Sequence, residues 1–187
     1  MIANPADLGD TLRALRREFD DSFALAPRTH AQAMESLLAI RVHGQPYALR
    51  VSDIDGLHAD RRVVPLPLQA AHLLGVASFR GRIAPVYDLA ALCGYSRAPS
   101  SRWLVLLRFR EPVALAFETF ERHFSVSPQD IMVAQSADLA THPAGAAHVS
   151  HAIRHDDTVR PIIQLQLLLA DIAQHCDLSH QQRSLST

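Results

Sequence analysis

Two segments of this chain share one pattern, and this internal repeat limits the folds that the chain can adopt. The stretch LLAIRVHGQPYALRVSDI at residues 37–54 aligns without a gap with WLVLLRFREPVALAFETF at residues 103–120. In both stretches an apolar run is followed by a turn ending in proline, Pro46 or Pro112, and then by strict alternation of large and small residues. Alternation with a period of two around turn residues predicts a β-hairpin. The sequence therefore predicts the same hairpin twice.

A second pair of segments extends the repeat. The stretch RIAPVYDLAAL at residues 82–92 aligns with TVRPIIQLQLL at residues 158–168, which places Pro85 over Pro161 and Leu89 over Leu165. A solenoid needs three or more units, so two units favour two small barrels related by a pseudo-twofold axis. Each barrel alone buries little core, and we therefore expect an apolar groove that both share. The expected fold class is all-β, with two pseudo-symmetric five-stranded β-barrels.

The start of the chain has a different pattern from the rest. Leucines and phenylalanines recur there at steps of three and four residues, which places them on one side of an α-helix. We expect an amphipathic helix within residues 1–28 and a linker at 29–35. The apolar stripe either packs on the chain's own barrels or docks on a partner, and the pattern favours neither strongly. The stripe consists of Leu8, Leu12, Leu15, Phe19 and Phe23.

Composition excludes several classes of function. The formal net charge is −1, so the chain has no general attraction for nucleic acid or for an anionic membrane. The two cysteines, Cys93 and Cys176, lie far apart and in no metal or redox spacing, which is typical of a reducing compartment. No stretch approaches the roughly 20 apolar residues of a membrane helix. We therefore expect a cytoplasmic protein with no direct membrane insertion.

The central stretch LLGVASFRGRIAPVYDLAALCGY, at residues 73–95, carries a family resemblance. Together with the hairpin containing PYAL and the segment VVPLP at residues 63–67, it resembles the CheW-like domain of bacterial chemosensory coupling proteins. The resemblance covers residues 36–172, with a first unit at about 36–97, a second at about 98–172 and a tail at 173–187. It implies a non-enzymatic adaptor without a cofactor. Its implied partners are the cytoplasmic tip of a methyl-accepting chemoreceptor and the regulatory domain of a CheA-type histidine kinase.

The resemblance also implies roles for individual residues. Arg80 is the signature arginine of the family and is expected to contact the receptor, together with Ile54 and Phe79. The chain departs from the family pattern at Gly56, where a glutamate is frequent and Asp55 is adjacent. It departs again at Ser78 and Phe79, where an asparagine and a leucine are usual. Asp88 is expected to organise backbone amides after its strand, because one isolated carboxylate makes a poor catalytic site. The residues expected to shape the groove and its turns are Gly75, Gly81, Pro85 and Asp88.

Two alternatives to the coupling function remain open. The first is a module that binds the kinase but has lost receptor coupling, because Gly56 removes a partner of the signature arginine. The second is a histidine-liganded metalloprotein, since HVSHAIRH brings His148, His151 and His155 close together in sequence. We expect no metal site there, because the repeat places this stretch just before a strand and no cysteine or glutamate motif completes a ligand set.

Overall fold

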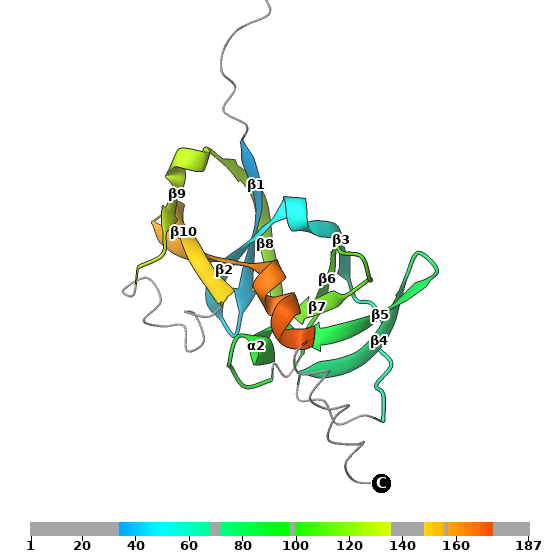
Figure 1. Cartoon of the computed structure of the whole chain (residues 1–187). Helices are drawn as coiled ribbons and strands as arrows, with labels where there is room; N and C mark the ends of the chain where they lie inside the picture. The colour runs from blue at the N-terminus through cyan, green and yellow to red at the C-terminus, as the bar shows by residue number, and fades with distance from the viewer. Residues whose placement is uncertain (1–33, 68–71, 98–99, 136–147, 156, 174–187) are drawn as a thin grey trace, which may run out of the picture. The chain divides into compact units, whose positions relative to one another are not determined.

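A computed structural model describes residues 34–67, 72–97, 100–135, 148–155 and 157–173 of the chain. The expected N-terminal helix, most of the linker and most of the tail lie outside these residues. Within the described part, most residues belong to two β-sheets that pack against each other (Figure 1). The mostly β fold expected from the sequence is confirmed.

The first sheet has six strands in the order β8-β1-β2-β11-β10-β9. Neighbours are antiparallel except β2 and β11, which pair in parallel through Ala48 and Ile162. A β-bulge in the pairing of β1 with β8, at Ala39 and Ile40, bends this sheet. Its strands are β1 (Glu35–Val42), β2 (Gln45–Arg50), β8 (Thr119–Val126), β9 (Ile131–Val133), β10 (Val149–His155) and β11 (Thr158–Ile163).

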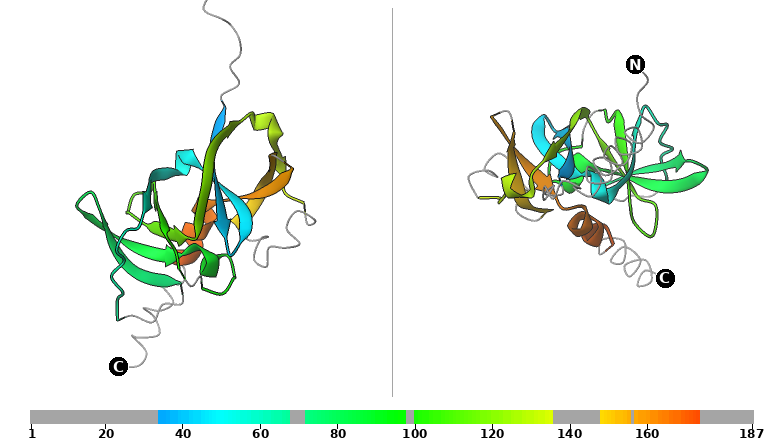
Figure 2. Two further views of the ribbon diagram at one scale, coloured as in Figure 1. Left: turned by 180° about the vertical axis from the view of Figure 1, so that it is seen from behind. Right: turned by 90° about the horizontal axis from the view of Figure 1, so that it is seen from above.

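The second sheet has five strands in the order β3-β6-β7-β5-β4. Its one parallel pair joins β5 and β7, where Val86 lies beside Ala114. Figure 2 shows the two sheets from behind and from above. The strands of this sheet are β3 (Ile54–Ala59), β4 (Leu73–Phe79), β5 (Arg82–Asp88), β6 (Trp103–Leu107) and β7 (Ala114–Phe117).

The short helical segments lie between strands or after them. The 3-10 helix η1 (Val51–Asp53) joins β2 to β3, α2 (Leu89–Leu92) follows β5, and η2 (Pro128–Asp130) joins β8 to β9. Residues 165–173 are helical and follow β11. This last helix packs on the junction between the sheets, because Leu165, Leu168 and Ile172 share a buried cluster with residues of both (Figure 1).

The strands of the two repeat units are divided between the two sheets in a way that the sequence pattern does not show. The two hairpins expected from the repeat are observed as β1–β2 and β6–β7. Each hairpin, however, pairs with the later strands of the other repeat: β1 and β2 join β8 and β11, while β6 and β7 join β3 and β5. Each sheet therefore contains strands from both halves of the sequence.

One apolar core joins the two sheets, as the size of the units led us to expect. Leu38, Ile40 and Leu49 of the first sheet and Leu107 and Leu115 of the second belong to the same buried cluster. Burial of apolar side chains stabilises the fold by about 25 cal/mol per Å² removed from water. Because both sheets contribute to this cluster, neither repeat unit has a complete core of its own.

The sheets differ in detail from two five-stranded barrels. The first sheet has a sixth strand, and among the described residues no ladder joins its outer strands or those of the second sheet. The additional strand β9 pairs with β10, and the equivalent segment of the first repeat makes only the isolated bridge between Val64 and Val76. Proline explains this difference, because Pro65 and Pro67 have no N–H group to continue a ladder.

Candidate functional site

The β4–β5 hairpin presents Arg80 at its tip. Phe79 pairs with Arg82, so Arg80 and Gly81 alone form the turn, and both have positive φ, 49° and 82° respectively. Two-residue hairpin turns need positive φ at both central positions so that their twist matches that of the strands. Gly81 adopts this conformation freely, whereas an arginine does so at a cost of about 1 to 2 kcal/mol. The turn therefore holds an exposed arginine in a strained position.

The guanidinium of Arg80 has no carboxylate partner in the described part of the chain. Its side chain is exposed, and so are Arg82 in the same hairpin and Arg61 and Arg62, which follow β3. Two other arginines near this sheet do form ion pairs, since Arg102 binds Asp60 at 3.1 Å and Arg97 lies 3.7 Å from Asp88. The surface around Arg80 is thus locally cationic although the whole chain is nearly neutral.

His58 lies beside this turn and was not singled out from the sequence. Its ring packs on that of Phe79, with centroids 5.0 Å apart and planes inclined by 55°. Burial, followed by the charges of Arg61 and Arg80, lowers the pKa of His58, and Asp55 opposes this shift. One feature of the sequence could have pointed to His58. It stands two residues after Gly56, and residues two apart in a strand face the same side.

The ring of His58 lies in the space that a side chain at position 56 would need. A Cβ atom at position 56 would lie 2.9 Å from Nε2 of His58, closer than real contacts of that kind. The departure from the family pattern at this position therefore has a local structural reason. The histidine ring stands beside the place where a longer side chain would begin.

Ile54 and Phe79 do not form an exposed surface with Arg80. Ile54 is 6% exposed and belongs to the core between the sheets, whereas Phe79 is 2% exposed and belongs to a separate cluster inside the second sheet. Strand alternation explains the burial of Phe79, which faces the same side as Ala77. Of the three residues expected to contact a receptor, only the side chain of Arg80 reaches solvent.

Gly75 is required where the segment before β4 crosses that strand. Its φ is +146°, and a Cβ atom there would lie 2.1 Å from the carbonyl oxygen of Val64. Val64 and Val76 exchange two backbone hydrogen bonds of 2.8 and 2.9 Å at this crossing. Pro85 pairs with Val76 on the other side of β4 and is half-buried. Gly75 thus permits a three-stranded contact that supports the hairpin.

Asp88 ends β5 and begins α2. Its Oδ1 accepts hydrogen bonds from the backbone N–H groups of Ala90 at 2.9 Å and Ala91 at 3.3 Å. An aspartate at this position satisfies amides that lack partners at a helix start. Asp88 is only 1% exposed. The expectation that this carboxylate organises backbone amides is confirmed.

An apolar patch lies on the outer side of the β4–β5 hairpin. Ile83 is 70% exposed, and Val64 is 49% exposed. The pairings of Ser78 with Ile83 and of Val76 with Pro85 and Val64 place these residues on one face, because they stand two positions apart along each strand. We call Val64, Ile83 and Pro85 the hairpin patch. Apolar patches on an otherwise polar surface are typical of protein contact sites.

The histidine-rich stretch lies just before β11, as expected, and itself forms β10. Strand β10 pairs with β11 in antiparallel fashion along its length. Its three histidines have different neighbours: His148 bonds Asp171 at 2.5 Å, His151 bonds Ser150 at 2.8 Å, and His155 stacks on Phe124. Across the described residues, no three His, Cys, Asp or Glu side chains are placed to hold a metal ion.

The described part of the chain contains no activated thiol. Cys93 is 5% exposed, and burial, with a further contribution from Asp88, raises the pKa of its thiol to about 12. A thiol with such a pKa stays protonated at neutral pH and is a poor nucleophile. None of the described helices is long and apolar enough to cross a membrane.

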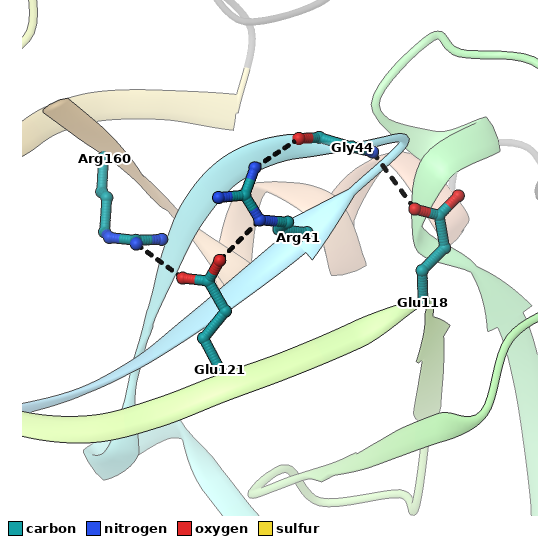
Figure 3. A network of polar contacts seen from close by, with 5 residues as sticks. All are labelled: Arg41, Gly44, Glu118, Glu121 and Arg160. Atoms are coloured by element: carbon teal, nitrogen blue, oxygen red, sulfur yellow. Dashed lines mark hydrogen bonds and ion pairs between the residues drawn. The ribbon is translucent and has the colours of Figure 1, made fainter. Parts of the chain in front are cut away.

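A carboxylate on the first sheet connects three strands. Glu121 of β8 accepts from Arg41 of β1 and from Arg160 of β11, both at 2.5 Å (Figure 3). Arg41 also donates to the carbonyl of Gly44, whose N–H donates to Glu118. Burial opposes ionisation of Glu121, but Arg160 and Arg41 outweigh it and lower the pKa of this carboxyl. This network fixes the first sheet and lies apart from the β4–β5 turn.

The two sheets with exchanged hairpins, an exposed arginine turn and a neighbouring apolar patch define a β-rich protein-interaction domain. A family model described as "CheW-like domain" matches residues 36–173. The chain belongs to the CheW-like domain family.

Two individual proteins illustrate this relationship. The chain is 27% identical over 77 residues to a probable chemotaxis protein CheW from Rhizobium etli, covering 41% of this chain and 50% of that one. It thus spans about half the length of this curated relative. The solved structure of the scaffolding protein TtCheW from Thermoanaerobacter tengcongensis has a similar fold, with a TM-score of 0.62 and 18% identity. That match covers 72% of this chain and 92% of the other.

Proposed function

We propose that this protein is a non-enzymatic adaptor that couples chemoreceptors to a CheA-type histidine kinase in a bacterial chemosensory system. The observation that carries this proposal is the exposed Arg80 at the tip of the β4–β5 hairpin, in a chain that belongs to the CheW-like family. The strained turn presents a charged group and gives it no partner of its own among the described residues. The positive φ of Arg80 follows from the two-residue turn, as it does at His43 in the β1–β2 turn, so the exposed and unpartnered charge is what supports a role in binding.

Arg80 is the proposed contact for the cytoplasmic tip of the receptor. A guanidinium offers several N–H donors in one plane and pairs well with carboxylates and amide oxygens. Ile54 and Phe79 are buried, so their proposed contribution is to hold β3 and the hairpin in place beneath this contact.

The hairpin patch is the proposed contact for the regulatory domain of the kinase. Ile83 and Val64 expose apolar surface that burial against a partner would remove from water. One hairpin carries both proposed contacts. A change in one bound partner therefore alters the free energy of binding the other, which is the proposed signalling mechanism.

A binding experiment with two charge variants tests this proposal. The full chain is mixed with a receptor cytoplasmic fragment and, separately, with a kinase regulatory domain. Arg80→Glu should weaken receptor binding at least about tenfold, because reversing one charge in a contact can cost several kcal/mol. Ile83→Glu should weaken kinase binding instead. Arg110→Glu, at an exposed arginine on the β6–β7 turn, is the matched control.

Each outcome of this experiment decides between the two partner assignments. Equal receptor binding by the unmodified chain and by Arg80→Glu would overturn the receptor contact. Kinase binding without any receptor binding would favour the alternative of a kinase-binding module that has lost receptor coupling. Both variants change exposed side chains and should alter the unfolding free energy by less than about 0.5 kcal/mol.

A further inference from the structure

We propose that a cationic cluster around His58 selects a partner segment rich in carboxylates and that protonation of His58 strengthens this contact at acid pH. The inference rests on the proposed receptor contact at Arg80 and names its chemistry and its regulation. The cationic cluster consists of Arg61, Arg62, Arg80 and Arg82.

Two contacts bring the members of the cationic cluster together. His58 packs on Phe79 near the end of β4, and Val64 bridges Val76 earlier in the same strand. The segment between these contacts, which includes Arg61 and Arg62, therefore runs beside the last residues of β4. Arg80 follows β4 directly, and Arg82 pairs with Phe79 across the hairpin. Residues from two separate parts of the sequence thus gather near His58, since the charges of both Arg61 and Arg80 act on its ring.

The four arginines of this cluster outnumber the carboxylates that the described chain places near His58, where Asp55 is the one that acts on the ring. None of its four arginines forms an ion pair with a described residue. Asp60, which follows the same strand, is already bound to Arg102 through both carboxylate oxygens, at 3.1 and 3.2 Å. A surface with unpaired guanidinium groups favours an incoming segment that brings carboxylates.

Gly56 leaves β3 without a carboxylate at position 56, so Asp55 is the carboxylate that this strand brings near the ring of His58. The ring of His58 lies where a side chain at position 56 would begin, with Nε2 2.9 Å from the place of a Cβ atom. The positive charge therefore remains available to a partner. His58 is only partly exposed and stands between Phe79 and the cluster.

His58 links the contact to pH. Arg61 and Arg80 disfavour its charged form, Asp55 favours it, and the facing residues Leu104 on β6 and Phe79 on β4 carry no charge. Because the pKa of His58 is lowered, the ring is neutral at pH 7. Carboxylates of a bound segment would offset the arginines and raise that pKa, so binding takes up a proton. By linkage, affinity then rises as the pH falls below the pKa that His58 has in the complex.

The experiment uses the full chain and two synthetic helical peptides. One peptide carries four glutamates on one face, and the other carries glutamines at the same positions. Fluorescence anisotropy at low salt should show at least tenfold tighter binding of the glutamate peptide, with affinity that falls as salt increases. The double variant Arg61→Gln with Arg62→Gln should lose at least fivefold of this affinity. His58→Phe keeps an aromatic ring against Phe79 and should bind equally at pH 8 but lose the increase at pH 5.5.

Several outcomes would overturn the inference. These are equal affinity for the two peptides, an unchanged affinity in the double variant, a pH dependence that persists in His58→Phe, or stronger binding to phosphatidylserine vesicles than to the glutamate peptide. Its failure is distinguishable from failure of the proposed function. A receptor fragment that binds through Arg80 while both peptides bind equally contradicts only this inference. A glutamate peptide that binds while no receptor fragment does contradicts only the proposed function.

Discussion

The ring of His155 on β10 lies parallel to the ring of Phe124 on β8, with centroids 4.6 Å apart and planes 8° apart. The offsets of the two repeat alignments, carried a few residues further, place Phe124 over His58 and His155 over Phe79, two residues whose rings also pack together with their planes 55° apart. Each half of the protein thus holds one phenylalanine and one histidine at equivalent positions, with the two residues exchanged. Both pairs connect strands that no described ladder joins. The ring pairs therefore stabilise the open side of each sheet.

The stacked pair on the first sheet should tolerate exchange but not truncation. The double variant Phe124→His with His155→Phe keeps both rings and should change the unfolding free energy by less than about 1.5 kcal/mol, as volume-conserving changes usually do. Phe124→Ala removes a ring that is 8% exposed and should cost about 3 kcal/mol. Urea unfolding followed by circular dichroism measures both. If the double variant lost as much unfolding free energy as Phe124→Ala, the two rings would not be interchangeable.

Stability should fall in mild acid because of His58. Burial, then Arg61 and Arg80, lower the pKa of His58 in the folded state below the ordinary histidine value of 6.5, whereas the unfolded chain keeps that ordinary value. The unfolded state therefore binds more protons between these two values, and the unfolding free energy decreases as the pH falls from 7 through this range. His58→Phe should make this decrease smaller. Unfolding curves at pH 7 and pH 5.5 for both proteins check the prediction, and an identical decrease in both would contradict it.

Gly75→Ala should be among the most damaging single changes in the hairpin. The added Cβ would meet the carbonyl oxygen of Val64 at 2.1 Å, and φ is already +146°. Since backbone atoms must move, we expect a loss of at least about 3 kcal/mol. Gly81→Ala is the matched control, because its Cβ has open space and only its positive φ costs about 1 kcal/mol. Thermal melts of both variants give the comparison, and similar losses would refute the steric explanation.

Glu121→Gln should destabilise the first sheet more than loss of its exposed partner Arg41 does. Arg160 is 5% exposed, and without Glu121 its charge would be buried and unpaired, which costs about 3 to 5 kcal/mol. Arg41→Gln leaves that pair intact and removes a half-exposed cation, so it should cost less than about 1 kcal/mol. Denaturant midpoints of the two variants test this order. The reverse order would show that Arg41 is the main partner.

The sequence by itself determined the local elements of the fold. Alternating residues around Pro46 and Pro112 identified both hairpins, because alternation and turn chemistry act over a few neighbouring residues. The position of Arg80 in a tight turn and the capping role of Asp88 depend on the same short range and were predicted for that reason. The internal repeat likewise predicted the two-unit plan, because aligned segments recur along one chain.

Only the tertiary structure decided which strands meet. The exchange of hairpins between the sheets depends on pairings such as Ala48 with Ile162, between residues remote in sequence, for which no local pattern exists. The burial of Ile54 and Phe79 follows from those pairings, since alternation gives two faces but not which one is covered. The cationic cluster was hidden for the same reason: a net charge of −1 sums over the whole chain, whereas folding brings Arg61 and Arg80 to one histidine. Long-range contacts, which local patterns do not encode, place these charges together.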